Sequence, residues 1–201
     1  MRIVLASGSP RRREILMDMG YLFAILSPSV DELDDLSAEF ETPEAFVLEN
    51  ARLKGDAVAA HSPDALVLSA DTTVSLAGEV LNKPADLDEA HQMIRRLSGN
   101  THTVYTGFQL LYELNDYRRE EVVASDVTFN ALTDAEIEAY FERVDPLDKA
   151  GAYGIQDGRD MIIASLEGSF TNVMGLPREA LSEQFSAFES WSGSRLPKSL
   201  A

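Results

Sequence analysis

Residues 1–16 read MRIVLASGSPRRREIL, an apolar strand pattern followed at once by a turn and a helix pattern. The run of residues 3–5 is typical of a buried strand, and the small polar residues after it end that strand. Ser9 suits the N-cap of a helix, and Pro10 suits its first position, where the missing N–H costs nothing. This stretch therefore predicts a strand, a tight turn and the start of a helix.

The first turn of this predicted helix carries three consecutive arginines, Arg11, Arg12 and Arg13. Helix N-termini carry a partial positive charge, so Arg12→Ala is expected to stabilise the ligand-free protein slightly. Backbone N–H groups, hydroxyl groups and guanidinium groups that converge at one point would bind an anion, and phosphate fits best. The alternative is a solvated basic turn with Ser9 as an ordinary cap. We favour the anion site.

Composition limits the class of protein. A chain of 201 residues forms one medium-sized domain, which we expect to cover residues 1–188, followed by a flexible tail over residues 189–201. The absence of cysteine excludes disulfides, thiol catalysis and thiolate metal sites. The three histidines lack the spacing of a zinc site. Any metal should therefore have oxygen ligands, which suits Mg²⁺ or Mn²⁺.

The charge balance is strongly acidic, with 34 acidic against 17 basic residues and a formal net charge of −17. This balance argues against non-specific binding to nucleic acid or to an anionic membrane, since both need a basic face. A small polyanionic ligand needs only local positive charge. No apolar stretch has membrane-spanning length and the first residues lack the pattern of a signal peptide, so we expect a cytoplasmic protein.

The order of strand and helix patterns predicts the fold. The expected strands are residues 3–5, 21–27, 65–70, 101–114, 120–129 and 161–166. Helix patterns begin near residues 10, 42, 86, 133 and 177. Strands and helices alternate early and a long hairpin follows. This pattern predicts an α/β fold with a mixed, bent β-sheet and flanking helices, which form two lobes around a central cleft.

Two carboxylates are candidates for chemistry in that cleft. Asp71 directly follows the apolar pattern of residues 65–70, and ligands of open α/β sheets bind beyond the carboxyl ends of strands. A carboxylate there can bind a divalent cation or take a proton from an attacking water. An Asx turn that ends the strand explains Asp71 equally well. Glu32, in the acidic loop of residues 31–35, is a candidate second carboxylate, although a solvated loop explains it more simply.

Three of the four lysines lie near these segments. Lys54 projects from the helix pattern that begins at residue 42, Lys83 precedes a proline, and Lys149 opens a glycine-punctuated loop. Each of them alone is compatible with an ordinary surface lysine. Together they supply the positive charge that a triphosphate requires. The chain has neither a P-loop nor a dinucleotide-binding motif.

These residues lie in motifs that resemble the Maf family of nucleoside triphosphate pyrophosphatases. In chain order the motifs are SGSPRR at 7–12, ADT at 70–72, KP at 83–84, LSG at 97–99 with His102, DKAGAYGIQ at 148–156 and GLP at 175–177. The resemblance implies a bilobed fold related to inosine triphosphate pyrophosphatases, usually as a homodimer. It also implies hydrolysis of a nucleoside triphosphate to nucleoside monophosphate and pyrophosphate with a divalent cation.

The resemblance also implies roles for single residues. Asp71 matches the catalytic acid, acting as general base or through the metal, and Glu32 matches an acidic metal-site position. The positions that bind phosphate in the family match Ser9, Arg12, Lys54 and Lys83. Lys149 is a further candidate for substrate binding. The chain departs from the pattern at Gly55, where alanine is common in the family.

Three further positions, Arg11, Thr72 and Gln156, concern the base. One branch of the family carries Trp, Gln and Glu there and prefers 7-methylguanosine triphosphate, whose cationic base Arg11 would repel. The amide of Gln156 offers a donor and an acceptor, which matches the O4 and N3–H edge of uracil or thymine. We therefore expect dTTP and UTP, including modified pyrimidine nucleotides, as substrates.

Two alternatives remain open. One is the 7-methylguanosine triphosphate branch. The other is a non-catalytic, nucleotide-sensing regulator of septum formation, since the family is linked by name to septum formation and division arrest. Cleaning of the nucleotide pool is a further compatible role. The presence of Asp71 with a full set of cations favours an enzyme.

Overall fold

The computed structural model describes residues 1–33, 36 and 40–199. Asp34 and Asp35 of the predicted acidic loop therefore lie outside the described residues, as do residues 200–201 of the predicted tail.

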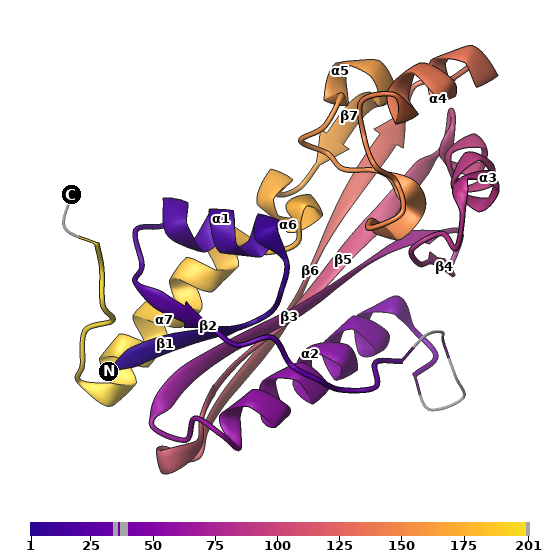
Figure 1. Ribbon diagram of the computed structural model, residues 1–201. Coiled ribbons are helices and arrows are strands. Elements are labelled where there is room, and N and C mark those ends of the chain that lie inside the picture. Colours follow the sequence, from indigo (N-terminus) through magenta and orange to yellow (C-terminus); the bar gives the residue numbers. More distant parts are fainter. Residues whose placement is uncertain (34–35, 37–39, 200–201) are drawn as a thin grey trace.

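The described residues form one mixed sheet of seven strands with flanking helices (Figure 1), which confirms the predicted fold class. The strand order is β2-β1-β3-β5-β6-β7, and β4 pairs with β3 off this path. The strands are β1 (Arg2–Ala6), β2 (Phe23–Ile25), β3 (Ala65–Leu76), β4 (Glu79–Leu81), β5 (Thr101–Tyr112), β6 (Tyr117–Phe129) and β7 (Ile163–Glu167). The pairs of β1 with β2 and β3 are parallel, whereas the remaining pairs are antiparallel.

The helices begin largely where local capping signals predict them. They are α1 (Pro10–Asp18), α2 (Pro43–Ala59), α3 (Leu87–Leu97), α4 (Asp134–Phe141), α5 (Arg159–Ile162), α6 (Phe170–Met174) and α7 (Arg178–Ser192), with short 3₁₀ turns η1 (Glu113–Asn115) and η2 (Ala150–Ala152). The caps of α1, α2, α3 and α4 are side chains that accept a backbone N–H, namely Ser9, Thr42, Asp86 and Thr133. Each of these caps satisfies an N–H group that the helix itself leaves unpaired.

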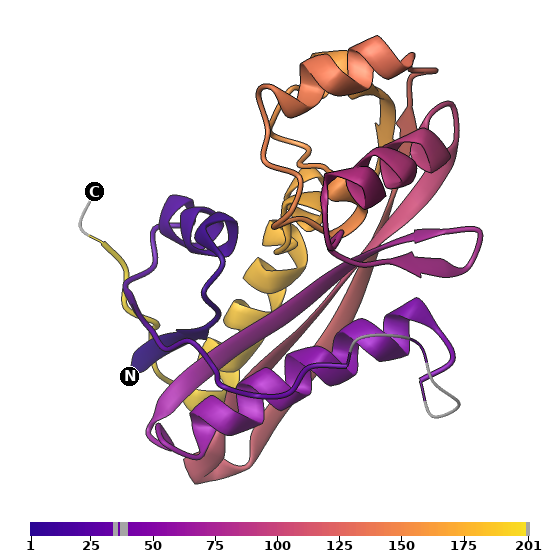
Figure 2. The same cartoon turned by 45° about the vertical axis from the view of Figure 1, so that its right-hand side comes forward.

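Two lobes share the three longest strands, β3, β5 and β6 (Figure 1). In the lower lobe, α7 packs on one face of the sheet and α2 on the other (Figure 2), because successive side chains of a strand point to opposite faces. The α7 side is built from Ile3, Leu5, Leu66, Leu68, Phe185 and Phe188, and the α2 side from Val4, Val67, Val58 and Ala59. The upper lobe has its own core, which includes Val74, Leu81, Ile94, Leu97, Phe129, Tyr140 and Tyr153.

The expectation that Asp71 ends its strand is wrong. Strand β3 continues to Leu76, because the backbone of residues 71–75 pairs with β5. On the other edge of β3, pairing with β1 ends at Ser69 and pairing with β4 begins at Val74. Among the described residues, no strand pairs with that edge between these two positions. Asp71 and Thr72 therefore lie in a gap between two edge strands.

The described part of the predicted flexible tail is packed against the lower lobe. Helix α7 continues to Ser192, Leu196 is buried among the residues of the α7 core, and Lys198 forms a bridge with Tyr21. The backbone of Pro197 and Ser199 bonds to that of Leu22 and Gly20, and the backbone N–H of Leu196 donates to Glu189. The polar composition of the segment does not reveal these contacts. None of the described helices is both long enough and apolar enough to cross a membrane.

Candidate active site

A cleft of about 1260 Å³ lies between the lobes at the gap in the edge of β3. The segments that line it are the β1–α1 turn, residues 27–33, the cleft-facing side of α2, the middle of β3, residues 82–83, the loop of residues 148–156 and residues 173–175. All the predicted site residues line this cleft: Ser9, Arg11, Arg12, Glu32, Lys54, Asp71, Thr72, Lys83, Lys149 and Gln156. Segments far apart in the sequence thus meet at one place, as the motif analysis expects.

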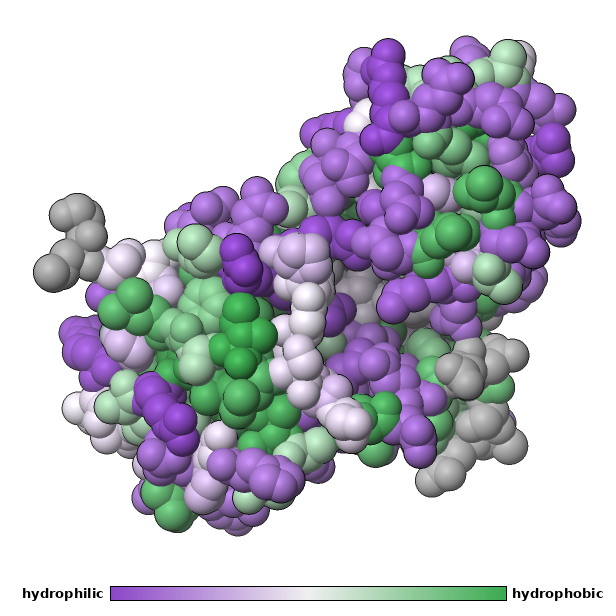
Figure 3. Space-filling view, in the orientation of Figure 1, coloured by the Kyte–Doolittle hydropathy of each residue, from purple (hydrophilic) through white to green (hydrophobic). Residues whose placement is uncertain are grey.

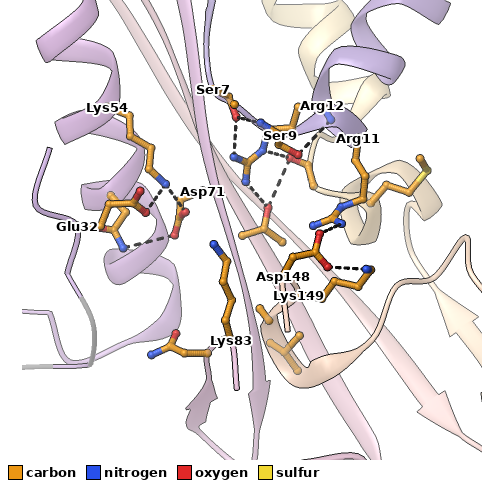
Figure 4. A pocket seen from close by; sticks show the side chains of 18 of the residues that line it. Ser7, Ser9, Arg11, Arg12, Glu32, Lys54, Asp71, Lys83, Asp148 and Lys149 are labelled. Atoms are coloured by element: carbon orange, nitrogen blue, oxygen red, sulfur yellow. Dashed lines mark hydrogen bonds and ion pairs between the residues drawn. The ribbon is translucent and has the colours of Figure 1, made fainter. Parts of the chain in front are cut away.

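One wall of the cleft places an ammonium group between two carboxylates (Figure 4). The Nζ atom of Lys54 lies 2.7 Å from Oδ1 of Asp71 and 2.5 Å from Oε2 of Glu32. The side chain of Lys54 is only 8% exposed, whereas that of Glu32 is 47% exposed. Lys54 therefore contacts two carboxylates, one from a strand and one from a loop.

Asn50, one helical turn before Lys54 on α2, also belongs to this wall. Its Oδ1 accepts the backbone N–H of Leu33 at 2.8 Å, and its Nδ2 donates to the carbonyl oxygen of Leu33 at 3.2 Å and to Oδ2 of Asp71 at 3.4 Å. Asn50 lies outside all the sequence motifs described above. The signal in the sequence is a polar side chain at a position of the apolar stripe of α2, next to Phe46 and Val47 in helical spacing.

A second wall contains the start of α1. There the buried side chain of Arg12 forms hydrogen bonds with several other segments of the chain. Its Nε donates to the carbonyl oxygen of Gly175 at 2.8 Å, one terminal nitrogen donates to Oγ of Ser7 at 3.2 Å, and the other donates to Oγ1 of Thr72 at 3.0 Å. Burial lowers the pKa of Arg12, and the charge of Asp71 opposes this effect. Three of the five N–H groups of the guanidinium thus bind the protein, and two remain for a ligand.

These contacts correct the expectation that loss of Arg12 stabilises the protein. The helix dipole opposes a cation at this position, but its effect is typically about 0.3–1 kcal/mol. Three hydrogen bonds from a charged, buried group outweigh it.

The predicted base-reading residue Thr72 belongs to the same network. Its hydroxyl accepts a hydrogen bond from Arg12 and lies 2.9 Å from the hydroxyl of Thr106. These contacts occupy most of the hydrogen-bonding capacity of the Thr72 hydroxyl. In this geometry the hydroxyl mainly holds the side chain of Arg12 in place. Direct contact of Thr72 with a base stays a prediction.

An acid that sequence analysis does not single out links the two lobes across the cleft (Figure 4). Asp148 lies 3.5 Å from a terminal nitrogen of Arg11 and 2.6 Å from Nζ of Lys149. Burial raises the pKa of Asp148, but the neighbouring charges of Lys149 and Arg11 outweigh it, so the pKa lies below its ordinary value. Lys149 also donates to the carbonyl oxygen of Asp145 at 2.7 Å. Arg11 and Lys149, like Lys54 and Arg12, therefore have a protein partner in the ligand-free protein.

Lys83 differs from the other cations of the cleft. It is exposed, follows β4, and extends from below toward the space between the two walls in Figure 4. Within residues 1–33, 36 and 40–199, its ammonium group makes no hydrogen bond or ion pair. Lys83 is therefore available to an anion without first losing a protein partner.

Buried aromatic side chains contact the loop of residues 148–156, which ends at Gln156. The hydroxyl of Tyr140 accepts the backbone N–H of Gly154 at 3.1 Å, and Nε2 of His102 lies 2.7 Å from the hydroxyl of Tyr153. Burial lowers the pKa of His102 to about 4, so its imidazole is neutral at neutral pH. These contacts present the exposed side chain of Gln156 at the mouth of the cleft.

The donor set fits a hard divalent cation. Mg²⁺ is usually bound by one or two carboxylates, with water and substrate phosphates as its remaining ligands. Glu32 and Asp71 already converge on the ammonium of Lys54, and the exposed side of Glu32 faces the cleft. Among the described residues, no group of three or more His, Cys, Asp or Glu side chains is placed to hold a metal. An ion held by Glu32 and Asp71 would need oxygens of water or of a bound phosphate to complete its coordination.

Fold and site together define an α/β protein with a two-lobed cleft, in which carboxylates face a set of cations. The chain belongs to the Maf family: the model of Maf-like proteins matches residues 2–188. It is 47% identical over 177 residues to a dTTP/UTP pyrophosphatase of Myxococcus xanthus, covering 87% of this chain and 86% of that one. It is 44% identical over 176 residues to a dTTP/UTP pyrophosphatase of Syntrophus aciditrophicus, covering 88% and 84%. A relative of the same name from Deinococcus radiodurans is 43% identical over 176 residues, covering 88% and 87%.

Proposed function

We propose that this protein hydrolyses nucleoside triphosphates, with dTTP and UTP as preferred substrates, to nucleoside monophosphate and pyrophosphate. The observation that carries the proposal is the cleft itself, where Asp71 lies beside Lys54 and within the same cavity as Lys83 and Arg12. The names of the relatives support the choice of dTTP and UTP.

In the proposed reaction, the oxygen of a water molecule attacks the α-phosphorus. The bond from that phosphorus to the bridging oxygen breaks, and pyrophosphate leaves. Asp71 accepts the proton of the attacking water as general base, and Lys54 orients its carboxylate. Lys83, the backbone at the start of α1 and the two free N–H groups of Arg12 bind the phosphate oxygens.

The first experiment measures pyrophosphate release from dTTP, UTP, CTP, GTP and 7-methyl-GTP. We expect kcat/KM to be largest for dTTP and UTP. Asp71→Asn should lower turnover by roughly 10²–10⁴-fold while the protein stays folded, because a positioned general base typically contributes that much. Wild-type protein that releases no pyrophosphate from any of these nucleotides, yet binds them, would favour the nucleotide-sensing alternative.

The second experiment concerns the base. Gln156→Glu removes the donor that faces O4 of the pyrimidine and adds a negative charge that attracts a cationic base. We expect kcat/KM for dTTP to fall by about 10-fold or more, and that for 7-methyl-GTP to rise. If 7-methyl-GTP is the best substrate of the wild-type protein, the selectivity proposal fails and the pyrophosphatase proposal survives.

We further propose that Glu32 and Asp71 hold Mg²⁺ or Mn²⁺. When bound, the ion supplies neutralisation of charge on the phosphate oxygens. Binding of Mn²⁺ can be followed by electron paramagnetic resonance without turnover. Glu32→Gln should weaken it, whereas Glu183→Gln, an exposed position on α7, should not. Equal Mn²⁺ affinity in these two variants contradicts this assignment.

We also propose a cytoplasmic homodimer that needs no nucleic acid or membrane. The net charge of −17 disfavours both of those partners. Support for self-association comes from the apolar surface around edge strand β2, seen in green at the lower left of Figure 3. Its exposed residues are Met17, Leu22, Ile25 and Leu26.

A further inference from the structure

The side chain of Asn50 is only 2% exposed, although it carries a polar amide. Both of its N–H groups and its oxygen have partners: the N–H and carbonyl groups of Leu33 and the carboxylate of Asp71. The amide of Asn50 thus bonds to the backbone N–H and carbonyl oxygen of Leu33 on one side and to the proposed general base, Asp71, on the other. The proposed reaction uses Asn50 for no step of its own.

We propose that Asn50 is a positioning residue that couples the two carboxylates of the site, Glu32 and Asp71. It orients Asp71 directly and holds Glu32 through the backbone of the next residue, Leu33. The inference rests on the proposed function, since it assigns a task within that reaction.

Glu32 needs such an anchor. It belongs to a segment, residues 26–33, that has neither helix nor strand structure, and its own side chain is 47% exposed. An ion pair with a half-exposed partner holds a loop only weakly, because its strength is typically about 0–1 kcal/mol. The side-chain amide of Asn50 bonds to both the backbone N–H and the backbone carbonyl oxygen of Leu33, in the way that the backbone of a neighbouring strand would. Leu33 therefore cannot shift without breaking contacts with a buried group.

The amide is the side chain that matches this task. Leu33 needs an acceptor for its N–H and a donor for its carbonyl oxygen, and Asp71 needs a second donor. A carboxylate at position 50 supplies only the acceptor, and a leucine of similar shape supplies neither. Asn50→Asp therefore removes both donor bonds but keeps the acceptor for the Leu33 N–H, whereas Asn50→Leu removes all three hydrogen bonds.

The test compares Asn50→Leu, Asn50→Asp and the control Val58→Ala with the wild-type protein. Val58 is a buried residue of α2 that packs on the sheet away from the cleft. The measurements are kcat and KM for dTTP at saturating Mg²⁺, the melting temperature, and the hydrogen exchange rate of the Leu33 amide in the nucleotide-free protein.

We expect kcat of Asn50→Leu and Asn50→Asp to fall by roughly 10- to 100-fold, because small misplacements of reacting groups have effects of this size. KM of Asn50→Leu, which adds no charge, should change by less than about 3-fold, since Lys83 and Arg12 do not contact Asn50. Exchange of the Leu33 amide should accelerate in Asn50→Leu but stay close to wild type in Asn50→Asp, which keeps the acceptor. Val58→Ala should lower the melting temperature and leave kcat and Leu33 exchange unchanged.

Two results overturn the inference. One is a kcat for both Asn50 variants equal to that of Val58→Ala, which makes Asn50 merely structural. The other is Leu33 exchange that does not respond to Asn50→Leu. If Asn50→Leu does not fold, kcat of Asn50→Asp decides. Wild-type protein that hydrolyses no nucleotide overturns the proposed function instead, and Leu33 exchange still tests the anchor separately.

Discussion

At the scale of single residues, four of the five predicted cations of the cleft fall into two groups. Arg12, Lys54 and Lys149 are buried and bound to the protein, so they shape the cleft as well as charge it. Lys83 is exposed and has no partner among the described residues. A cation that is predicted to bind the ligand can thus also stabilise the folded site. Measuring the free energy of unfolding of a variant without ligand shows whether its side chain has this structural role.

Arg12→Ala should lower the free energy of unfolding by about 2–4 kcal/mol in the absence of nucleotide, because it removes three hydrogen bonds and leaves buried acceptors unpaired. The matched control is Arg13→Ala, an exposed arginine in the same helical turn, which should change stability by less than about 0.5 kcal/mol. Urea unfolding of both variants measures the difference. Equal stability of the two variants would reduce Arg12 to a ligand-binding cation.

The neutral His102 predicts how stability depends on pH. The folded protein protonates it only near a pKa of about 4, whereas the unfolded chain does so near 6.5. The unfolded state therefore binds more protons between these values, and stability falls as pH decreases through this window, by about 3 kcal/mol in total. His102→Asn should remove this part of the acid sensitivity, and the exposed His61→Asn should retain it. Parallel stability curves against pH for the two variants would contradict the prediction.

At the scale of elements, the cleft depends on how closely α2 approaches β5. Gly107 permits this approach: a Cβ atom there would lie 2.9 Å from backbone atoms of Val47 and Leu48. Gly55, which departs from the family pattern, faces side chains instead, with Oγ of Ser69 at 2.6 Å and Nε2 of Gln109 at 3.0 Å. Both glycines therefore determine how closely α2, the helix that carries Asn50 and Lys54, packs on the sheet.

Gly107→Ala should lower the free energy of unfolding by at least about 1–3 kcal/mol, because backbone atoms of α2 cannot move aside independently. Gly55→Ala should cost less, since a hydroxyl group and an amide at the end of a side chain can rotate away. Urea unfolding of the two variants compares backbone and side-chain obstruction in one interface. A larger loss in Gly55→Ala than in Gly107→Ala would show that this account of the packing is wrong.

Local signals in the sequence predict elements, and long-range pairing escapes them. The caps Ser9, Thr42, Asp86 and Thr133 are predictable because their hydrogen bonds span three residues. The continuation of β3 beyond Asp71 is not, because it depends on pairing with β5, whose partner residues lie 28 to 36 positions further along the sequence.

The candidate site divides in the same way. Its motif residues are found from sequence and do line one cleft, but their pairing is not readable from sequence. That Asp148 links Arg11 to Lys149, and that Asn50 reaches Leu33, follows only from the arrangement of four separate segments.

At the scale of the whole molecule, the predicted ligand-binding cations line one cleft, and the exposed apolar residues lie largely in other places. The surface around β2 is such a place, at an edge of the sheet whose outer side has no strand neighbour among the described residues. Exposed edge strands with apolar side chains favour association.

We expect the wild-type protein to elute with twice the mass of the chain when light scattering follows size exclusion. Leu22→Glu should shift it to the monomer, because it places a charge within the apolar surface around β2. Leu114→Glu, an equally exposed leucine at the tip of the β5–β6 hairpin, should remain dimeric. A monomeric wild-type protein would exclude the homodimer, and a dimeric Leu22→Glu would exclude this interface.

The exposure of the lysines has a consequence for chemical labelling. Of the four lysines, Lys54 and Lys149 are buried and held by carboxylates, so reagents that acylate amines should reach only the exposed Lys83 and Lys198, besides the amino terminus. Lys198 lies over the ring of Tyr21, far along the chain from the cleft motifs. In a Lys198→Arg background a bound triphosphate would therefore protect Lys83 from the reagent, and the extent of labelling at that amine would report on the occupancy of the cleft.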